Sequence, residues 1–252
     1  MIALVFALTS PVADAASVDE VLTEIGQIAP LRSMRKARQA PAIPEQAYRN
    51  AAEGKPSSGV HFVDGVAAGK GWGVAIFDQP VESVWMAVNS DESFADRLPL
   101  STSTIIEGDL HRDGRILFQY MPLPIVKDRW WIVDVRQNSE LYQASNGKLW
   151  ELAWTDATDE ARLAGRNEAD VASGGIPVAW THGSWLMVEL DDGRTLVEYF
   201  AWSDPGGLIP AGPASRFARS AILKTFKEVE AMAREYGAAQ PGGYVKPDQT
   251  PL

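Results

Sequence analysis

The chain has 252 residues, contains no cysteine and carries a formal net charge of −10 at pH 7. The absence of cysteine excludes disulfides, thiolate catalysis and cysteine-ligated metal sites. The negative charge disfavours nucleic acid and anionic membrane surfaces as partners, because both repel an acidic protein.

The first residues have the composition of a secretory leader. Residues 2–8 are apolar, and Ala13-Asp14-Ala15 has the small-x-small pattern of a cleavage site. This pattern predicts a signal peptide over residues 1–15 that is cleaved after Ala15, and the alternative is a retained apolar N-terminus. With cleavage, we expect a periplasmic or secreted protein.

Residues 16–70 are predicted to form a helical extension and a connector. Ser17 and Glu20 have the spacing of a capping box at the start of a helix over residues 17–39. A second, short helix is expected over residues 45–52. Four cations near the end of the first helix indicate either a patch for anionic lipid or the charges that a helix dipole favours at its C-terminus: Arg32, Arg35, Lys36 and Arg38.

Residues 71–238 have the pattern of one α+β domain. A helix is predicted over residues 80–89, and a long helix follows residue 210. Residues 156–175 predict a polar surface insertion or a long loop, and residues 239–252 predict a disordered tail. Alternating segments bounded by turn residues predict strands over residues 72–76, 103–110, 115–121, 128–136, 149–154, 185–190 and 195–202.

Three segments carry a family resemblance. Residues 78–85 read DQPVESVW, residues 122–124 read PLP before DRWWIV at 128–133, and residues 203–210 lead into the long helix. Together they resemble the START-like superfamily, which includes StAR-related lipid-transfer domains and polyketide cyclases, although Trp130 stands where START domains usually show Asp. The resemblance implies a helix-grip fold, in which a curved antiparallel sheet wraps around the long C-terminal helix.

The resemblance also implies a cavity under the last helix. Strand side chains alternate between two faces, and the face that bears Trp131 is wholly apolar. We expect such faces to line the cavity, with ordinary core packing as the alternative. The corner Asp204-Pro205-Gly206-Gly207 would be its hinge. The predicted wall consists of Phe118, Tyr120, Trp131, Val133, Val135, Trp150 and Trp154, closed by Phe217, Ile222 and Phe226 of the last helix.

Few residues suggest catalysis or metal binding, and we expect no cofactor and no metal. Asp109, His111 and Asp113 alternate as metal ligands would, but Asp113-Gly114 is more simply a hairpin turn. Glu198 is expected to face solvent, with a role as a cavity anchor or base as the alternative. The polar candidates for an enzyme site are Tyr120, Arg129, Glu198 and Tyr199.

The favoured hypothesis is a monomeric protein that binds a hydrophobic small molecule. A further step of this hypothesis is that the protein also transports the molecule. A lipid, a sterol-like compound or a quinone would suit such a cavity, and transient membrane contact would accompany transport. One alternative is an enzyme of the cyclase or hydrolase kind on the same fold, since one fold hosts many functions. The other is a protein-binding module of the cell envelope.

Overall fold

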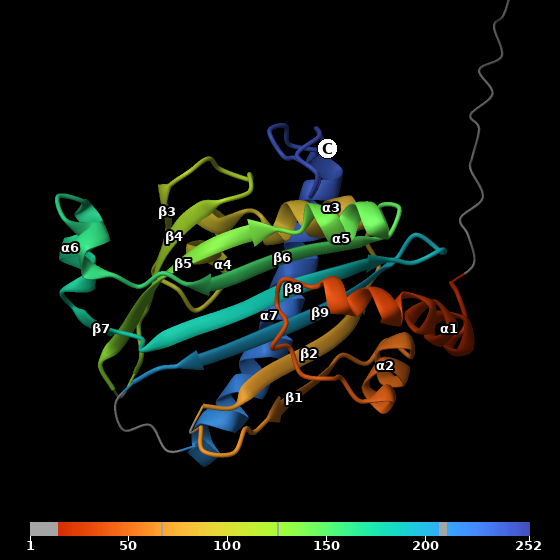
Figure 1. Cartoon of the computed structure of the whole chain (residues 1–252), viewed down its shortest axis with the longest axis horizontal. Coiled ribbons are helices and arrows are strands. Elements are labelled where there is room, and N and C mark those ends of the chain that lie inside the picture. Colours follow the sequence, from red (N-terminus) through yellow and green to blue (C-terminus); the bar gives the residue numbers. More distant parts are fainter. Residues whose placement is uncertain (1–14, 67, 125, 207–210) are drawn as a thin grey trace, which may run out of the picture.

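One antiparallel sheet with helices on both of its faces organises the chain (Figure 1). The computed structural model describes residues 15–66, 68–124, 126–206 and 211–252, with the backbone alone for residues 211–218. Most of the predicted signal peptide and Gly207 of the predicted hinge therefore lie outside the described residues. No helix in the described part of the chain is long and apolar enough to cross a membrane.

The sheet confirms the predicted α+β class and contains each strand that alternation indicated. Eight strands run antiparallel in the order β1-β2-β9-β8-β6-β5-β4-β3, and β7 adds a short parallel pair to β5. The strands are β1 (Ser57–His61), β2 (Lys70–Phe77), β3 (Thr102–Glu107), β4 (Arg115–Met121), β5 (Asp128–Gln137), β6 (Leu149–Asp156), β7 (Gly175–Pro177), β8 (Trp180–Glu189) and β9 (Thr195–Asp204).

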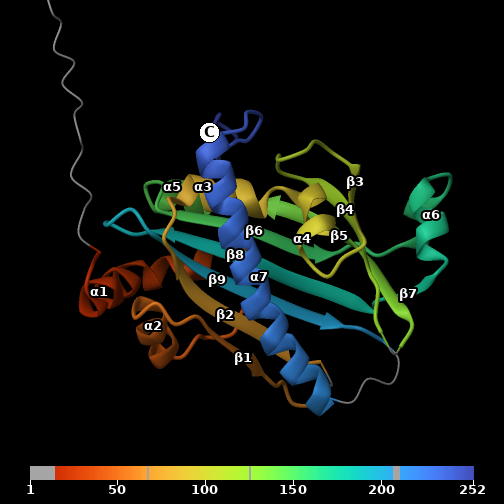
Figure 2. The same cartoon turned by 180° about the vertical axis from the view of Figure 1, so that it is seen from behind.

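The long helix α7 (Ala211–Ala239) lies across one face of the sheet, which we call the inner face (Figure 2). Its apolar residues recur at three- and four-residue steps, and Ile222, Phe226 and Val229 are buried in the main core. Gly73 on β2 permits this approach, because a Cβ atom there would lie 2.5 Å from Cγ2 of Ile222. Helix α3 (Val81–Val88) packs beside α7 and buries Trp85 in the same core.

The N-terminal extension covers the opposite, outer face of the sheet. It comprises α1 (Val18–Ile28), the 3-10 helix η1 (Ala29–Met34) and α2 (Glu45–Ala52). The capping box is confirmed, since Ser17 and Glu20 each accept a hydrogen bond from the other's backbone amide. The predicted helix over residues 17–39 is too long, because Pro30 lacks the amide hydrogen that an α-helix interior needs.

Two segments that were expected to be irregular are ordered. The polar insertion contains η3 (Glu160–Leu163) and α6 (Asn167–Ala172), which pack on the outer face. The predicted disordered tail is wrong, because Tyr244 and Val245 are buried and the Trp85 indole donates to the Val245 carbonyl at 2.7 Å. The remaining short helices are η2 (Asp91–Ser93), α4 (Phe94–Arg97) and α5 (Ser139–Ala144).

Candidate functional site

The inner face brings together most of the predicted cavity wall. β5 and β6 direct one side of each strand into the core that α3 and α7 cover. The side chain of Phe217 lies outside the described residues. The contact of the other residues with a ligand stays a prediction. The predicted residues on the inner face are Trp131, Val133, Val135, Trp150, Trp154, Ile222 and Phe226.

Phe118 and Tyr120 do not belong to this wall, so their predicted position is wrong. The register of β4 on β5 pairs Phe118 with Ile132 and Tyr120 with Trp130, which places all four on the outer face. There they pack beneath the insertion that contains η3 and α6. The polar Gln119 suggested that its own side of β4 faces solvent, but Gln119 points inward and the insertion covers the side that bears Phe118 and Tyr120.

The amide of Gln119 is hydrogen-bonded on the inner face. It pairs with Trp131 across the strands, and its Oε1 accepts the Trp131 indole N–H at 2.8 Å. Its Nε2 donates to Ser103 Oγ at 3.1 Å. A partly buried polar group is tolerated when it has such partners. The inner face therefore offers a polar point beside an apolar wall.

Packing differs between the two ends of the inner face. At the end near α3, Trp85, Val229 and Met232 are at most 1 % exposed, and they fill the space between helix and sheet. At the other end, Trp131 and Trp154 remain partly exposed although they lie on the same face. Further partly exposed members of this end, which we call the open end, are Leu98, Ile105, Met121 and Tyr199.

Aromatic rings at the open end are arranged around Tyr199. Its ring centroid lies 4.6 Å from that of Trp185 and 5.9 Å from that of Trp154. Gly183 makes room for Trp154, because a Cβ atom there would lie 2.0 Å from the indole Cζ2. Burial raises the pKa of Tyr199 to about 12, so its phenol is neutral at physiological pH and can donate a hydrogen bond.

The four polar candidates for an enzyme site do not converge. Tyr199 faces inward and Arg129 lies on the same side of β5 as Trp131, whereas Tyr120 and Glu198 lie on the outer face. Arg129 instead fixes the strand-to-helix corner. Its guanidinium donates to the carbonyls of Lys127, Pro205 and Gly206. This arrangement contains no acid–base pair on the inner face among the candidates that the sequence suggested.

The corner before α7 is tied to the start of β5. Arg129 is 5 % exposed and holds two consecutive carbonyls of the corner. The Asp204 carboxylate accepts the Gly206 N–H at 2.9 Å, and Gly206 has a φ of +66°, which favours glycine. Motion of this corner as a hinge stays a prediction, and Arg129 is the side chain that opposes it.

The outer face holds a buried charge network that the sequence analysis missed. Glu198 is 1 % exposed, so the expectation that it faces solvent is wrong. Its carboxylate accepts hydrogen bonds from Arg32 at 2.8 and 2.5 Å, from Arg35 at 3.2 Å and from the Tyr48 hydroxyl at 2.9 Å. Burial alone would raise the pKa of Glu198, but Arg32 and then Arg35 hold it below its usual value of 4.5.

Glu151 on β6 extends this network, two strands away from Glu198 on β9. It is fully buried and accepts from Arg35 Nε at 3.2 Å, from Asn138 Nδ2 at 2.7 Å and from the Lys36 amide at 2.7 Å. Arg35 also donates to Ser184 Oγ at 2.9 Å. Arg32 and Arg35 are therefore neither a lipid patch nor simple helix-end charges, because they bind the extension to the sheet.

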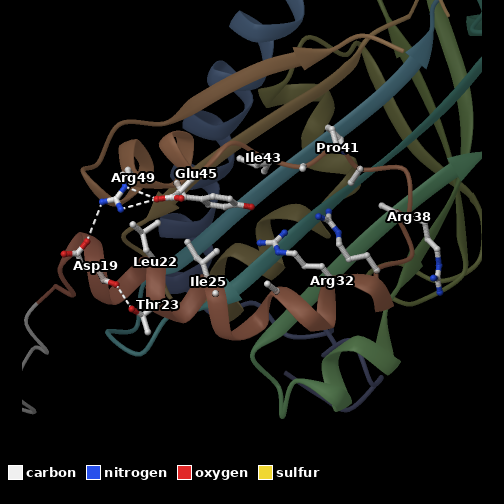
Figure 3. A pocket seen from close by; sticks show the side chains of 17 residues that line it. Asp19, Leu22, Thr23, Ile25, Arg32, Arg38, Pro41, Ile43, Glu45 and Arg49 are labelled. Carbon is white, nitrogen blue, oxygen red and sulfur yellow. Dashed lines mark hydrogen bonds and ion pairs between the residues drawn. The ribbon is translucent and has the colours of Figure 1, made fainter. Parts of the chain in front are cut away.

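A pocket of about 780 Å³ lies within the extension, between α1, η1, residues 37–43 and α2 (Figure 3). Leu22, Ile25 and Ile43 give it apolar walls, and Arg32 reaches it from the network. Both terminal nitrogens of Arg32 already bind Glu198, so its charge is compensated. The pocket lies on the outer face and is separate from the inner face under α7.

The hairpin of residues 102–121 contains the turn at Asp113-Gly114 that was predicted in preference to a metal site. The His111 ring stacks on Tyr244 at 3.7 Å, and its Nδ1 lies 2.8 Å from the Asn89 carbonyl. The Asp113 carboxylate accepts the Gln137 amide at 2.6 Å. Within the described residues, no three side chains of His, Asp or Glu are grouped as metal ligands.

Comparisons with known proteins establish the fold of the chain. No family model matches the sequence, and no curated protein matches it. Among solved structures, the STAR-related lipid transfer protein from Xanthomonas axonopodis has a TM-score of 0.58 and 17% identity, and the match covers 72% of this chain and 94% of that one. Human STARD10 has a TM-score of 0.61 and 12% identity, covering 85% and 81%.

A third solved structure agrees with these two. Human StAR-related lipid transfer protein 5 has a TM-score of 0.57 and 12% identity, and the match covers 86% of this chain and 96% of that one. Identities at this level establish likeness of fold alone. The sheet order, the inner position of α7 and these matches lead to one conclusion: the chain has the START-like, helix-grip fold.

Proposed function

We propose that this protein binds a hydrophobic small molecule, such as a lipid, a sterol-like compound or a quinone, at the open end of the inner face. One observation carries the proposal: Trp131, Trp154 and Tyr199 lie on the inner face and yet stay partly exposed. The lipid-transfer names of the structural neighbours support the same class of ligand. Ligand sites of this kind are mostly apolar, with a few polar groups that fix orientation.

Burial of apolar surface would supply most of the affinity. Removing about 300 Å² of ligand surface from water is worth roughly 7 kcal/mol at ~25 cal/mol per Å², before the costs of association. The Tyr199 phenol and the Gln119 amide would orient a hydroxyl, ester or quinone oxygen by hydrogen bonding. Because both groups are neutral, they suit an uncharged polar end better than an ionised one.

We further propose that the protein transports its ligand. A carrier must release its ligand, and the corner beside α7 would have to open for that to happen. Such release would involve transient contact with a membrane. The predicted signal peptide supports a periplasmic or secreted site of action.

The first test compares two neighbouring tryptophans on opposite faces of β5. The protein is incubated with vesicles of phosphatidylethanolamine and phosphatidylglycerol, re-isolated and examined by native mass spectrometry. We expect Trp131→Ala to lower lipid uptake about tenfold, since losing ~60 Å² of apolar contact is worth about 1.5 kcal/mol. Trp130→Ala is the matched control, because Trp130 is buried on the outer face and would not touch the ligand.

Both variants are compared per folded molecule, with circular dichroism as the measure of folding. Uptake that falls equally in the two variants would show that stability, not contact, is responsible. Wild-type protein that stays empty after exposure to the vesicles would contradict the proposed ligand class.

The role of the corner is tested by Arg129→Lys. A lysine keeps the charge but cannot hold two carbonyls with one planar group. One hydrogen bond to a charged group is worth about 1.5–3 kcal/mol, so we expect release of a pyrene-labelled lipid to accelerate about tenfold or more. Arg97→Lys, at an exposed pair with Glu235, serves as the control. An unchanged release rate in Arg129→Lys would indicate a fixed corner.

A further inference from the structure

We propose that Asp192 is the docking site of the mature N-terminus, which is created when the chain is cut between Ala15 and Ala16. The α-ammonium group of Ala16 would bind the Asp192 carboxylate and fasten the extension to the β8–β9 turn. This role is independent of ligand binding on the inner face.

Two separate observations point to the same bond of the chain. The sequence Ala13-Asp14-Ala15 predicts cleavage after Ala15. In the structure, the nitrogen of Ala16 lies 2.8 Å from Oδ2 of Asp192, far away in the sequence. Ala15 is exposed, whereas Ala16 is partly buried against the core beneath α1. The scissile bond therefore lies where the chain passes from the surface into a defined position.

The site around Ala16 holds both of its backbone polar groups. The Asp192 side chain is 4 % exposed, and its Oδ2 also accepts Arg194 Nε at 2.8 Å. Arg194 Nη2 donates to the Ala16 carbonyl at 3.3 Å. Burial would raise the pKa of Asp192, but the Arg194 side chain and the amides of Ala16 and Arg194 lower it, so the carboxylate is ionised at neutral pH.

The next residues fix Ala16 in register. Ser17 is the N-cap of α1, and its amide donates to the Glu20 carboxylate at 2.8 Å. Glu24, one turn further along α1, accepts the Asp191 amide at 3.0 Å. Helix α1 and the β8–β9 turn are thus joined at two points, and a shift of one residue would remove Ala16 from Asp192.

Cleavage changes the chemistry of this contact. A peptidase adds water across the bond: the carbonyl carbon of Ala15 takes the oxygen, the C–N bond breaks and Ala15 leaves as a carboxylate. The nitrogen of Ala16 becomes an ammonium group with three donors and a positive charge, in place of one neutral N–H. Hydrogen bonds between ionised partners are roughly twice as strong as neutral ones.

The surrounding charges favour an added cation at this point. Asp192 pairs with Arg194 and Asp191 pairs with Lys148 at 2.5 Å, while Glu24, which accepts the Asp191 amide, adds a further negative charge beside this turn. The dipole of α1 opposes a positive charge near its first residue. Glu20, in the first turn and bonded to the Ser17 amide, compensates for that dipole.

The cleavage site is tested with the full chain. It is expressed with its own N-terminus in a Gram-negative bacterium, and the exported protein is analysed by intact mass and N-terminal sequencing. We expect the sequence to begin Ala-Ser-Val-Asp, from Ala16. Any other N-terminus would overturn the proposal, because a longer or shorter chain would carry no ammonium group at Asp192.

The docking itself is tested by a four-way comparison. Mature protein from Ala16 is made with a free or an acetylated N-terminus, each with Asp192 or with Asp192→Asn, and melting temperatures are measured at pH 7. In the protein with Asp192, we expect the free N-terminus to give a melting temperature about 2–4 °C higher than the acetylated one. In Asp192→Asn we expect no such difference.

Asp191→Asn is the matched control, since it removes the same charge from the same turn and should keep the full difference between free and acetylated chains. If Asp192→Asn does not fold, the comparison of free and acetylated wild-type chains still decides. The proposal would be overturned if the free and acetylated wild-type chains had equal melting temperatures. It would also be overturned if the free and acetylated Asp192→Asn chains differed as much as the wild-type chains do.

Discussion

Glu198→Gln is expected to lower the free energy of unfolding by about 3–5 kcal/mol, the usual cost of breaking a buried ion pair from one side. The substitution keeps the shape of the side chain but removes the charge that faces Arg32 and Arg35. The Arg35 side chain is only 8 % exposed, so water cannot replace the lost partner. Urea unfolding at pH 7 measures the change. Since Glu198 holds the extension on the outer face, α1 and α2 should also become sensitive to proteolysis.

The control for this variant is Glu189→Gln, at an exposed position on β8, where we expect a change within about 0.5 kcal/mol. A pH series adds a second check. The pKa of Glu198 is lowered on folding, so its contribution is complete above the unfolded value of about 4.5 and is lost as pH falls through the folded value. The stability gap between wild type and variant should therefore be constant above that pH and narrow below it. A gap no larger than that of the control would contradict the network.

Arg115→Met is expected to have the second large effect, again about 3–5 kcal/mol. Arg115 at the start of β4 is fully buried, and its guanidinium binds both oxygens of Asp91, at 2.5 and 3.2 Å. Its third contact is the Arg112 carbonyl at 2.9 Å. Methionine fills a similar volume but leaves the Asp91 carboxylate buried without its partner.

A double-mutant cycle tests this interpretation. Asp91→Ala alone should be strongly destabilising, and the double variant Asp91→Ala with Arg115→Met should lose much less than the sum of the two single losses. Chemical denaturation of all four proteins gives the coupling. Additive losses would show that the two side chains contribute separately and that their pairing is not the cause.

The architecture was predictable where the sequence has a clear period. On β5, Trp131, Val133 and Val135 form one apolar side while Asp134 and Arg136 lie on the other, so the side of Trp131 could be assigned to the inner face. The last helix shows its apolar stripe at Ile222, Phe226 and Val229 for the same reason. β1 lacks such a pattern: Gly59 serves as a platform for Trp72, and its Cβ atom would lie 2.3 Å from the indole Cζ2.

The candidate site was less predictable because both faces of the sheet are covered. For β4, the insertion buries Phe118 and Tyr120 on the outer face, so one polar residue, Gln119, could not identify the solvent side. Glu198 looked exposed for a similar reason. A signal was present in the sequence, since Leu196 and Phe200 flank Glu198 on the same face of its strand and indicate that this face is buried. Only the tertiary contact shows that Arg32 and Arg35 are the partners.

The central claim is the position of the ligand on the inner face, and photo-crosslinking tests it most directly. A phospholipid analogue with a diazirine in its acyl chain is delivered from phosphatidylcholine vesicles, irradiated, and located by peptide mapping. We expect labelling of the open end, at Met121, Trp131 and Trp154. Labelling confined to the outer pocket, at residues such as Leu22 and Ile43, would contradict the claim and would assign binding to the N-terminal extension.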